Sequence, residues 1–269
     1  MNSTIYDVGM NNGDDTAYYL HKGYDVVAIE ADPTLCDQAK RRFAKLISSG
    51  RVKILNIGIA PTEGMREFWI SDMNSYWNSF NRKGACKGGG TAHPIVVKCQ
   101  PFRQVLEEFG TPLYLKVDIE GYDKYCLTDL DPHNLPKYVS IEMNHKDGIT
   151  DIQLLAQLGY NSFQCVRQND FRAIHPENVD WQFQLRRAAV RLGKIGRVIN
   201  QLRYRMPRDE HWTFRLGSSG PFGDDLRGPW LSVNQISGVW KKLHNQDIAL
   251  NARGLGEWYD IHAKLTVSH

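Results

Sequence analysis

A glycine-bearing turn between an apolar strand and a helix occupies the first sixteen residues, and it constrains the fold more than any other feature. The apolar run 4–8 predicts a buried strand, which the turn from Gly9 to Gly13 ends. Asp14 is expected to cap a helix that continues through Leu20. A strand that turns through glycines into a helix directs backbone N–H groups to the edge of a sheet, where open α/β sheets bind nucleotides.

An acid at the end of the next strand supports a nucleotide site. The apolar run 25–29 predicts a second strand, and Glu30 follows it about twenty residues beyond the turn, the spacing expected for an acid that binds a ribose. An ordinary strand–turn–helix with a surface acid is the alternative. Because the paired glycines and the acid occur together, the nucleotide site is the favoured interpretation.

The charge of the turn indicates which nucleotide it binds. The dinucleotide fingerprint G-x-G-x-x-G places an anionic pyrophosphate at the helix start. Here the pattern is Gly9-x-Asn11-x-Gly13 with no third glycine, and Asp14 and Asp15 follow it. Two carboxylates would repel a pyrophosphate and suit the ammonium and sulfonium of S-adenosylmethionine (SAM). The turn therefore favours a methyltransferase, with a nicotinamide-dependent oxidoreductase as the alternative.

Composition limits the class of protein further. The chain has 269 residues, of which 42% are hydrophobic, so it can form a large core. Its formal net charge of +3 is too small to argue for a nucleic-acid partner, and none is expected. The five scattered cysteines include no C-x-x-C pair, and no leader or membrane-spanning run is found. These features predict a cytoplasmic protein with reduced thiols.

Strands alternate with helices over the first 165 residues or so. This alternation predicts an α/β fold with a doubly wound, mostly parallel sheet. The expected later strands are 51–57, 65–70, 94–98, 113–117, 138–142 and 160–166, and the expected later helices are 33–50, 102–109, 122–130 and 151–158. We expect residues 1–170 to form the cofactor-binding domain and residues 171–269 to form a helical and aromatic C-terminal extension packed on it.

Polar residues follow two of the buried strands. Asp118 and Glu120 end the strand of the LKVDIEG motif, and His145 follows the strand 138–142. Catalytic groups of such sheets lie at the carboxyl ends of strands. We therefore expect Glu120, Asp118 and His145 to be catalytic residues, with Glu120 as the general base that accepts the proton of an acceptor hydroxyl. A structural acid at a helix start and a surface histidine are the alternatives.

The motifs DVGMNNGDDT, AIEADP, LKVDIEG and SIEMN together resemble the FkbM-type family of SAM-dependent methyltransferases over about residues 4–168. The polar-aromatic stretch 74–80, expected to be a flexible loop near the cofactor, is similar to a serine-bearing stretch of that family. The resemblance implies a Rossmann-like class I methyltransferase fold, SAM as cofactor and mostly hydroxyl acceptors. The residues it implies in cofactor binding are Asp7, Gly9, Met10, Asn11, Gly13, Asp14, Thr16, Glu30, Ala31, Ile57, Gly58, Ser79 and Asp118.

A basic segment begins the C-terminal extension. Between Trp181 and Arg208 the chain has eight basic residues and no acidic one. A helix is predicted here, because apolar residues recur at spacings of three and four, at Leu185, Ala188, Leu192, Ile195, Ile199 and Leu202. A packed helix with a solvated basic face is the favoured interpretation. A lid over an anionic acceptor, a dimer contact and a membrane-surface helix are the alternatives.

The last third of the chain contains five of its seven tryptophans, which indicates a packed structure. Ser232 is expected to cap a helix over 233–243. His211, Trp258, Asp260 and His262 are the expected substrate residues, although these aromatic and polar side chains also suit a core of the extension itself. Asp260 and His262 share a face only if their segment is a strand.

The predicted function is O-methylation of a hydroxyl on a small molecule or glycan, by in-line displacement at the SAM methyl group. The spacing of these residues requires no metal, although an Asp118, Glu142 and His145 cluster binding a divalent ion is an alternative. A non-catalytic module that recruits a partner through the basic segment is the third hypothesis.

Overall fold

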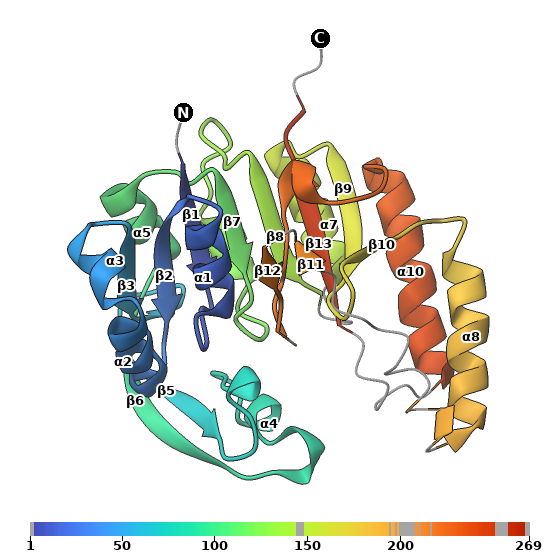
Figure 1. Cartoon of the computed structure of the whole chain (residues 1–269), viewed down its shortest axis with the longest axis horizontal. Helices are drawn as coiled ribbons and strands as arrows, with labels where there is room; N and C mark the ends of the chain where they lie inside the picture. Colours follow the sequence, from blue (N-terminus) through green and yellow to red (C-terminus); the bar gives the residue numbers. More distant parts are fainter. Residues whose placement is uncertain are drawn as a thin grey trace. The chain divides into compact units, whose positions relative to one another are not determined.

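A computed structural model of the chain describes residues 3–143, 148–193, 195–196, 198, 208–209, 211–215, 217–250 and 258–266. The chain forms two compact units, Met1–Ile141 and Glu142–His269. Figure 1 shows the elements of each unit along the chain.

Parallel strands form the main sheet of the first unit. They are β1 (Thr4–Val8), β2 (Asp25–Glu30), β3 (Val52–Asn56), β7 (Tyr114–Val117) and β8 (Tyr138–Glu142). Their order is β8-β7-β1-β2-β3, and every pairing among them is parallel. The chain proceeds outward from β1 to β3 and then resumes at β7 on the other side of β1. The predicted mostly parallel sheet is thus confirmed, and its order reverses between β1 and β7, where open sheets of this kind bind ligands.

Helices cover both faces of this sheet. Tyr114 is in register with Ile5, so Tyr114 and Tyr6 point to opposite faces. Tyr19 of α1 (Asp14–His21) packs edge-on against Tyr114, with ring centroids 5.7 Å apart. Phe102 of α5 (Phe102–Phe109) packs in the same way on Tyr6 at 6.2 Å. Aromatic pairs on opposite faces therefore confirm a doubly wound sheet.

The start of α1 differs from the expectation. Its N-cap is Gly13, which has a φ of 77° and no side-chain cap, and Asp14 is the first helical residue. The N–H of Asp14 instead donates to Oδ1 of Asn12 at 3.0 Å. Because Asn12 takes this local hydrogen bond, Asp14 is left for the first turn, where a carboxylate also suits the positive end of the helix dipole.

The helix predicted over 33–50 is divided in two. Asp32 caps α2 (Pro33–Arg42), because its Oδ1 accepts the N–H of Thr34 at 2.8 Å. Phe43 then leaves the helical conformation before α3 (Ala44–Ser48) begins. Its ring is buried against Gly13, where an added Cβ would lie 2.9 Å from Cε2. Packing under the glycine turn thus explains the break.

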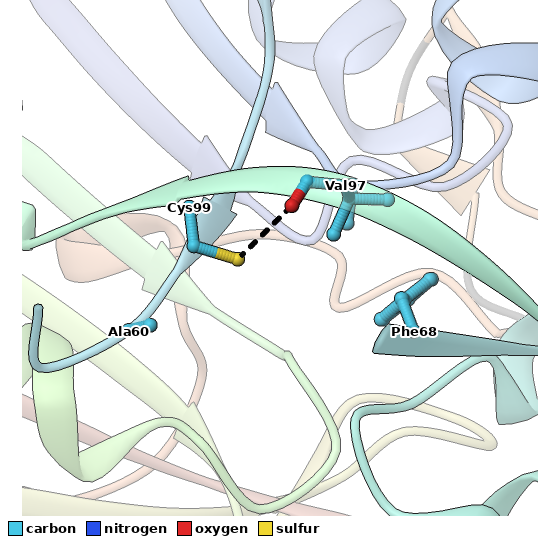
Figure 2. Packing of buried hydrophobic residues seen from close by; sticks show 5 residues of the cluster. Ala60, Phe68, Val97 and Cys99 are labelled. Atoms are coloured by element: carbon cyan, nitrogen blue, oxygen red, sulfur yellow. Dashed lines mark hydrogen bonds between the residues drawn. The ribbon is translucent and has the colours of Figure 1, made fainter. Parts of the chain in front are cut away.

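The strands predicted at 65–70 and 94–98 belong to a second sheet. It consists of β4 (Gly58–Ile59), β5 (Gly64–Ser71) and β6 (Ala92–Gln100) in the order β4-β6-β5, with β5 and β6 antiparallel. Residues 72–91, here called the arm, connect β5 to β6 and contain η1 (Ser75–Trp77), α4 (Arg82–Ala85) and η2 (Lys87–Gly89). An apolar cluster packs on this sheet and consists of Ala31, Ala60, Phe68, Val97 and Cys99. Figure 2 shows part of this cluster.

The second unit is built on antiparallel strands. β9 (Ser162–Arg167) pairs with both β10 (Arg172–Ile174) and β13 (Tyr259–Lys264). A division of the chain at residue 170 would separate β9 from these two partners. The remaining elements are α6 (Lys124–Thr128) in the first unit, and α7 (Gly148–Leu158), α8 (Val179–Arg191), β11 (Arg208–Asp209), β12 (Trp212–Thr213), η3 (Gly223–Asp225) and α10 (Val233–Leu250) in the second. Ser232 caps α10 as predicted, since its Oγ accepts the N–H of Gln235 at 3.4 Å.

The predicted apolar stripe of the basic segment is not the buried face of its helix. Leu192 and Ile195 are 56% and 69% exposed. Arg186 is instead only 4% exposed, and its Nη1 lies 3.5 Å from the hydroxyl of Tyr259. The face of the helix that contacts Tyr259 of β13 therefore contains an arginine instead of the predicted apolar stripe. Residues 199–207 lie outside the described residues, and within those described no helix combines the length and apolar character that a membrane span needs.

We predict that Gly9→Ala destabilises the first unit strongly. An added Cβ would lie 1.8 Å from the backbone oxygen of Asp118, and Gly9 has a φ of 81°. Overpacking and left-handed strain together should cost about 3 kcal/mol or more of the free energy of unfolding, measured by urea denaturation. Gly23→Ala is the matched control, because Gly23 has a φ of 95° but no neighbour within 4 Å. Its cost should be about 1 kcal/mol; equal costs would contradict the close approach of the two loops.

Candidate functional site

The glycine turn is anchored to the end of β2. The N–H groups of Gly9 and Met10 both donate to the carbonyl of Ile29, at 2.9 and 3.0 Å. Asn11 has a φ of 51°, and its N–H donates to Oε2 of Glu30 at 2.8 Å. The structure therefore brings together the turn and the acid that the sequence spacing paired.

Glu30 is a buried carboxylate with a shifted pKa. It is 7% exposed, and its Oε1 accepts the N–H of Asp32 at 2.9 Å. Burial raises the pKa of Glu30 to about 7, although hydrogen bonds from Asp32 and Asn11 lower it. Each oxygen accepts one of these bonds, and a carboxylate oxygen can accept two, so both retain capacity to accept a hydroxyl.

Lys116, which the sequence analysis did not single out, joins β7 to the glycine turn. It is 3% exposed; its Nζ donates to the carbonyl of Gly9 at 2.9 Å and lies 3.0 Å from Oδ1 of Asp7. Burial lowers the pKa of Lys116, but the carboxylates of Asp7, Asp118 and Asp15 outweigh burial and raise it above its ordinary value. The sequence signal that could have identified Lys116 is a lysine within an apolar strand, which needs a partner such as the aspartate in the strand of residues 4–8.

Two of the predicted cofactor residues, Asp7 and Thr16, belong to this buried network. Asp7 is fully buried, and the hydroxyl of Thr16 donates to its Oδ2 at 2.6 Å. Thr16 is also fully buried. The side chains of Asp7 and Thr16 thus support the turn, and Met10, at 2% exposed, contributes its side chain to the core.

The two acids at the start of α1 are each placed beside a cation. Asp14 Oδ1 accepts a hydrogen bond from Nη1 of Arg42 at 2.9 Å, and Asp15 Oδ2 lies 3.9 Å from Nζ of Lys116. Arg42 compensates the charge of Asp14, whereas Lys116 lies closer to Asp7, at 3.0 Å, so Asp15 shares its cation with another carboxylate. The electrostatic argument for a cationic ligand therefore loses the contribution of Asp14 and keeps much of that of Asp15.

Three acids lie at the end of β7. Asp123 accepts the N–H groups of Ile119 and Gly121, at 3.2 and 3.0 Å, and burial raises its pKa to about 6, with a further rise from Asp118. Glu120 has a φ of 53°, a conformation that a non-glycine residue adopts at a cost. Burial raises the pKa of Glu120, although Lys87 lowers it. The turn after β7 thus presents a carboxylate with a shifted pKa on a strained backbone.

The arm contacts the loops that follow β1, β2 and β7. Its Ser75 hydroxyl donates to Oδ1 of Asn11 at 3.2 Å, and Asn78 Nδ2 donates to Oδ2 of Asp32 at 3.1 Å. Lys87 Nζ lies 2.6 Å from Oε2 of Glu120. The polar-aromatic stretch thus contacts the loops of the candidate site through Ser75 and Asn78, and part of it, Ser75–Trp77, is a short helix where a flexible loop was expected.

The remaining predicted cofactor residues have mainly packing roles. Ser79 is 1% exposed, and its Oγ accepts the N–H of Asn81 at 3.0 Å within the arm. Ile57 precedes Gly58, where an added Cβ would lie 2.5 Å from Phe80. Ala31 belongs to the apolar cluster with Ala60, Phe68, Val97 and Cys99. Ser79 and Ala31 are thus buried in packing contacts.

The predicted substrate residues lie in the second unit in two different environments. His211 and Trp258 are exposed, whereas Asp260 and His262 are 2% and 1% exposed. β13 is a strand, so Asp260 and His262 share a face, and Oδ1 of Asp260 accepts Nε2 of Gln168 at 2.8 Å. Burial lowers the pKa of His262 to about 3. His145 lies outside the described residues, and within them no group of three His, Cys, Asp or Glu side chains is placed to hold a metal.

The parallel sheet, the glycine turn and the acids at its strand ends define a Rossmann-like α/β protein. The sequence model of the family described as methyltransferase FkbM domain matches residues 7–162, more than half of the chain. The chain therefore belongs to the FkbM methyltransferase family. No curated protein matches the chain.

Several solved structures are distantly similar. The methyltransferase FkbM from Methylobacillus flagellatus KT is 16% identical over 58% of this chain and 37% of its own, with a TM-score of 0.38. The precorrin-6y C5,15-methyltransferase from Geobacter metallireducens GS-15 is 12% identical over 62% and 67%, with a TM-score of 0.37. A chain described as StiE O-MT is 11% identical over 100% and 70%, with a TM-score of 0.39. This chain thus spans little more than a third of the first of them.

We predict that His262 weakens the fold in acid. Its pKa is about 3 in the folded chain and about 6.5 in the unfolded chain, so between these values the unfolded chain binds the extra proton. The free energy of unfolding should fall, relative to His262→Gln, by up to about 1.4 kcal/mol for each pH unit below about 6.5. Denaturant titrations of both proteins at pH 5 and pH 7 measure this difference, and parallel pH dependences would contradict the shift. Using the difference removes the opposite contribution of Glu30, whose raised pKa favours the fold at lower pH.

Proposed function

We propose that this chain is a SAM-dependent O-methyltransferase. The observation that supports this most directly is the pairing of the glycine turn with buried Glu30, in a chain that belongs to a methyltransferase family. The backbone of Asn11 and the carboxylate of Glu30 lie side by side at a sheet edge where such folds bind nucleotides. A ribose with two hydroxyl groups suits a carboxylate whose oxygens can each accept another hydrogen bond.

The residues proposed to hold SAM lie at the ends of β1, β2 and β3. Gly9, Asn11 and Gly13 would present backbone to the methionine part, Glu30 would bind the ribose, and Ala31, Ile57 and Gly58 would border the adenine. Gly9 itself is required by the protein's own packing, because a Cβ there would meet the backbone oxygen of Asp118 at 1.8 Å. This close approach of two backbones holds the glycine turn against the loop after β7. When bound, SAM supplies a methyl group activated by a sulfonium.

The chain's own residues then have to position a hydroxyl and remove its proton. Glu120 is the proposed general base, since burial raises its pKa and a base works best with a pKa near the working pH. The proton of the acceptor hydroxyl would pass to the Glu120 carboxylate, which frees the oxygen as a nucleophile. That oxygen would form the new bond to the methyl group of bound SAM as the methyl–sulfur bond breaks, and S-adenosylhomocysteine would leave. Asp118 and Asp123 favour this proton transfer, because both raise the pKa of Glu120.

The acceptor is proposed to be a hydroxyl compound, a small molecule or a glycan. The resemblance to the FkbM-type family, whose acceptors are mostly hydroxyls, supports this class. Asp260 and His262 share one face of β13, but they are 2% and 1% exposed and so suit the core of the second unit. The exposed His211 and Trp258 are the remaining candidates for contact with the acceptor.

We predict that Glu30→Ala weakens SAM binding about 10-fold to 100-fold, the effect of losing hydrogen bonds to a charged group. Isothermal titration calorimetry with SAM measures it. Asp37→Ala is the matched control, because Asp37 is an exposed acid on α2, with 61% of its side chain accessible. The control should bind SAM like the wild type. Tight binding of NAD together with no binding of SAM would identify an oxidoreductase instead, and unchanged activity of Glu30→Ala would favour the non-catalytic module.

We predict that Glu120→Gln lowers kcat by about 100-fold or more, as expected for loss of a general base, while SAM affinity changes far less. Formation of S-adenosylhomocysteine, measured over a panel of polyols, phenols and oligosaccharides, provides the assay. Glu107→Gln, an exposed acid on α5, should retain wild-type turnover. Wild-type kcat in Glu120→Gln would transfer the role of base to another residue.

A further inference from the structure

The arm, residues 72–91, behaves as one folded piece. The N–H of Asp72 donates to the carbonyl of Thr91 at 3.0 Å, and the Thr91 hydroxyl donates to Oδ2 of Asp72 at 2.6 Å, which closes its base. Ser79 also exchanges backbone hydrogen bonds of 3.0 and 2.9 Å with Trp69 of β5, which joins the arm to the strand before it. Gly88 lies against Trp77, where an added Cβ would be 3.6 Å from the indole. The arm therefore has internal contacts of its own.

Polar side chains attach this piece to the loops that follow β1, β2 and β7. Ser75 and Tyr76 contact the glycine turn, through Asn11 at 3.2 Å and Asn12 at 3.3 Å. Asn78 contacts Asp32 after β2 at 3.1 Å. Lys87 contacts Glu120 after β7, with 2.6 Å between Nζ and Oε2.

The ion pair at the β7 end differs in kind from the other three attachments. Both of its partners are charged, and the Lys87 side chain is 44% accessible against 20% for Glu120. The two residues are 33 positions apart, so no local secondary structure holds them together. Glu120 reaches Lys87 from a backbone with a φ of 53°, so the strained turn after β7 directs its carboxylate to the arm.

We propose that Lys87 is a positioning residue: its ion pair with Glu120 fastens the arm over the strand ends and prolongs the residence of bound SAM. This inference rests on the proposed function, because it assigns SAM to the edge that the arm contacts. A ligand held by the glycine turn, Glu30 and the β7 end is released when the arm detaches from them. Lys87 also holds the Glu120 carboxylate in one position, in which the carboxylate can accept the proton of the acceptor hydroxyl.

The experiment compares SAM dissociation rates, measured by stopped-flow fluorescence after displacement with excess S-adenosylhomocysteine. We expect Lys87→Met to raise the dissociation rate about threefold, the usual effect of losing a partly exposed ion pair. Lys83→Met is the matched control: it makes the same change in charge on the same arm, at an exposed residue that has no ion pair in the described part of the chain. Its rate should equal that of the wild type.

Further measurements separate fastening from a general structural effect. Lys87→Arg should restore the slow rate, since a guanidinium also pairs with a carboxylate. Glu120→Gln should raise the rate as Lys87→Met does, and the double variant should add little to either. High salt should accelerate release from the wild type more than from Lys87→Met. Equal rates for Lys87→Met, Lys83→Met and wild type would overturn the inference.

Amide hydrogen exchange without any ligand tests the fastening independently of the proposed function. Residues 82–90 should exchange faster in Lys87→Met than in Lys83→Met, and equal protection would overturn the inference as well. A wild type that binds no SAM, with the exchange difference present, would contradict the proposed function and leave the fastening of the arm standing.

Discussion

The site depends on the ion pair between the buried Lys116 and Asp7. A lysine in an apolar sheet is tolerated only when its charge is compensated, and removing one member of such a group leaves the other buried and unpaired. Lys116 meets Asp7 on the neighbouring strand and the carbonyl of Gly9 beyond it. It thereby joins β1 and β7, the two neighbouring strands between which the strand order reverses. This ion pair therefore fixes the position of the glycine turn.

The second sheet and its arm follow from where the first sheet ends. β3 is an edge strand of the first unit, and the chain leaves it at once through β4 into the sheet of β4, β5 and β6. The apolar cluster that includes Phe68 and Val97 also includes Ala31, the residue after Glu30. Packing on Ala31 therefore anchors β5 and β6 to the end of β2. The arm extends from these two strands and makes its polar contacts with the strand ends from there.

The sequence predicted the parts of this site that depend on local chemistry. The glycine turn, Glu30 and the β7 acids follow from patterns of a few residues, and each has a backbone conformation or hydrogen bond that its residue type favours. The contacts that involve distant residues were not predicted: Lys116 with Asp7, Arg42 with Asp14, and Lys87 with Glu120. The apolar stripe of the basic segment failed for the same reason, because Tyr259 selects a different face of α8.

These distant pairs change the meaning of the acids in the motifs. Asp14 and Glu120 each pair with a cation from another element, and Asp15 shares Lys116 with Asp7, so the edge of the sheet is less negative than its motifs indicate. Glu30 has no such ion pair among the described residues, and burial raises its pKa. In the proposed function, recognition of a ligand at this edge therefore depends on hydrogen bonds to Glu30 as well as on charge. Charge also orders the protein's own loops, which is why a lysine thirty-three residues away can control an acid at the site.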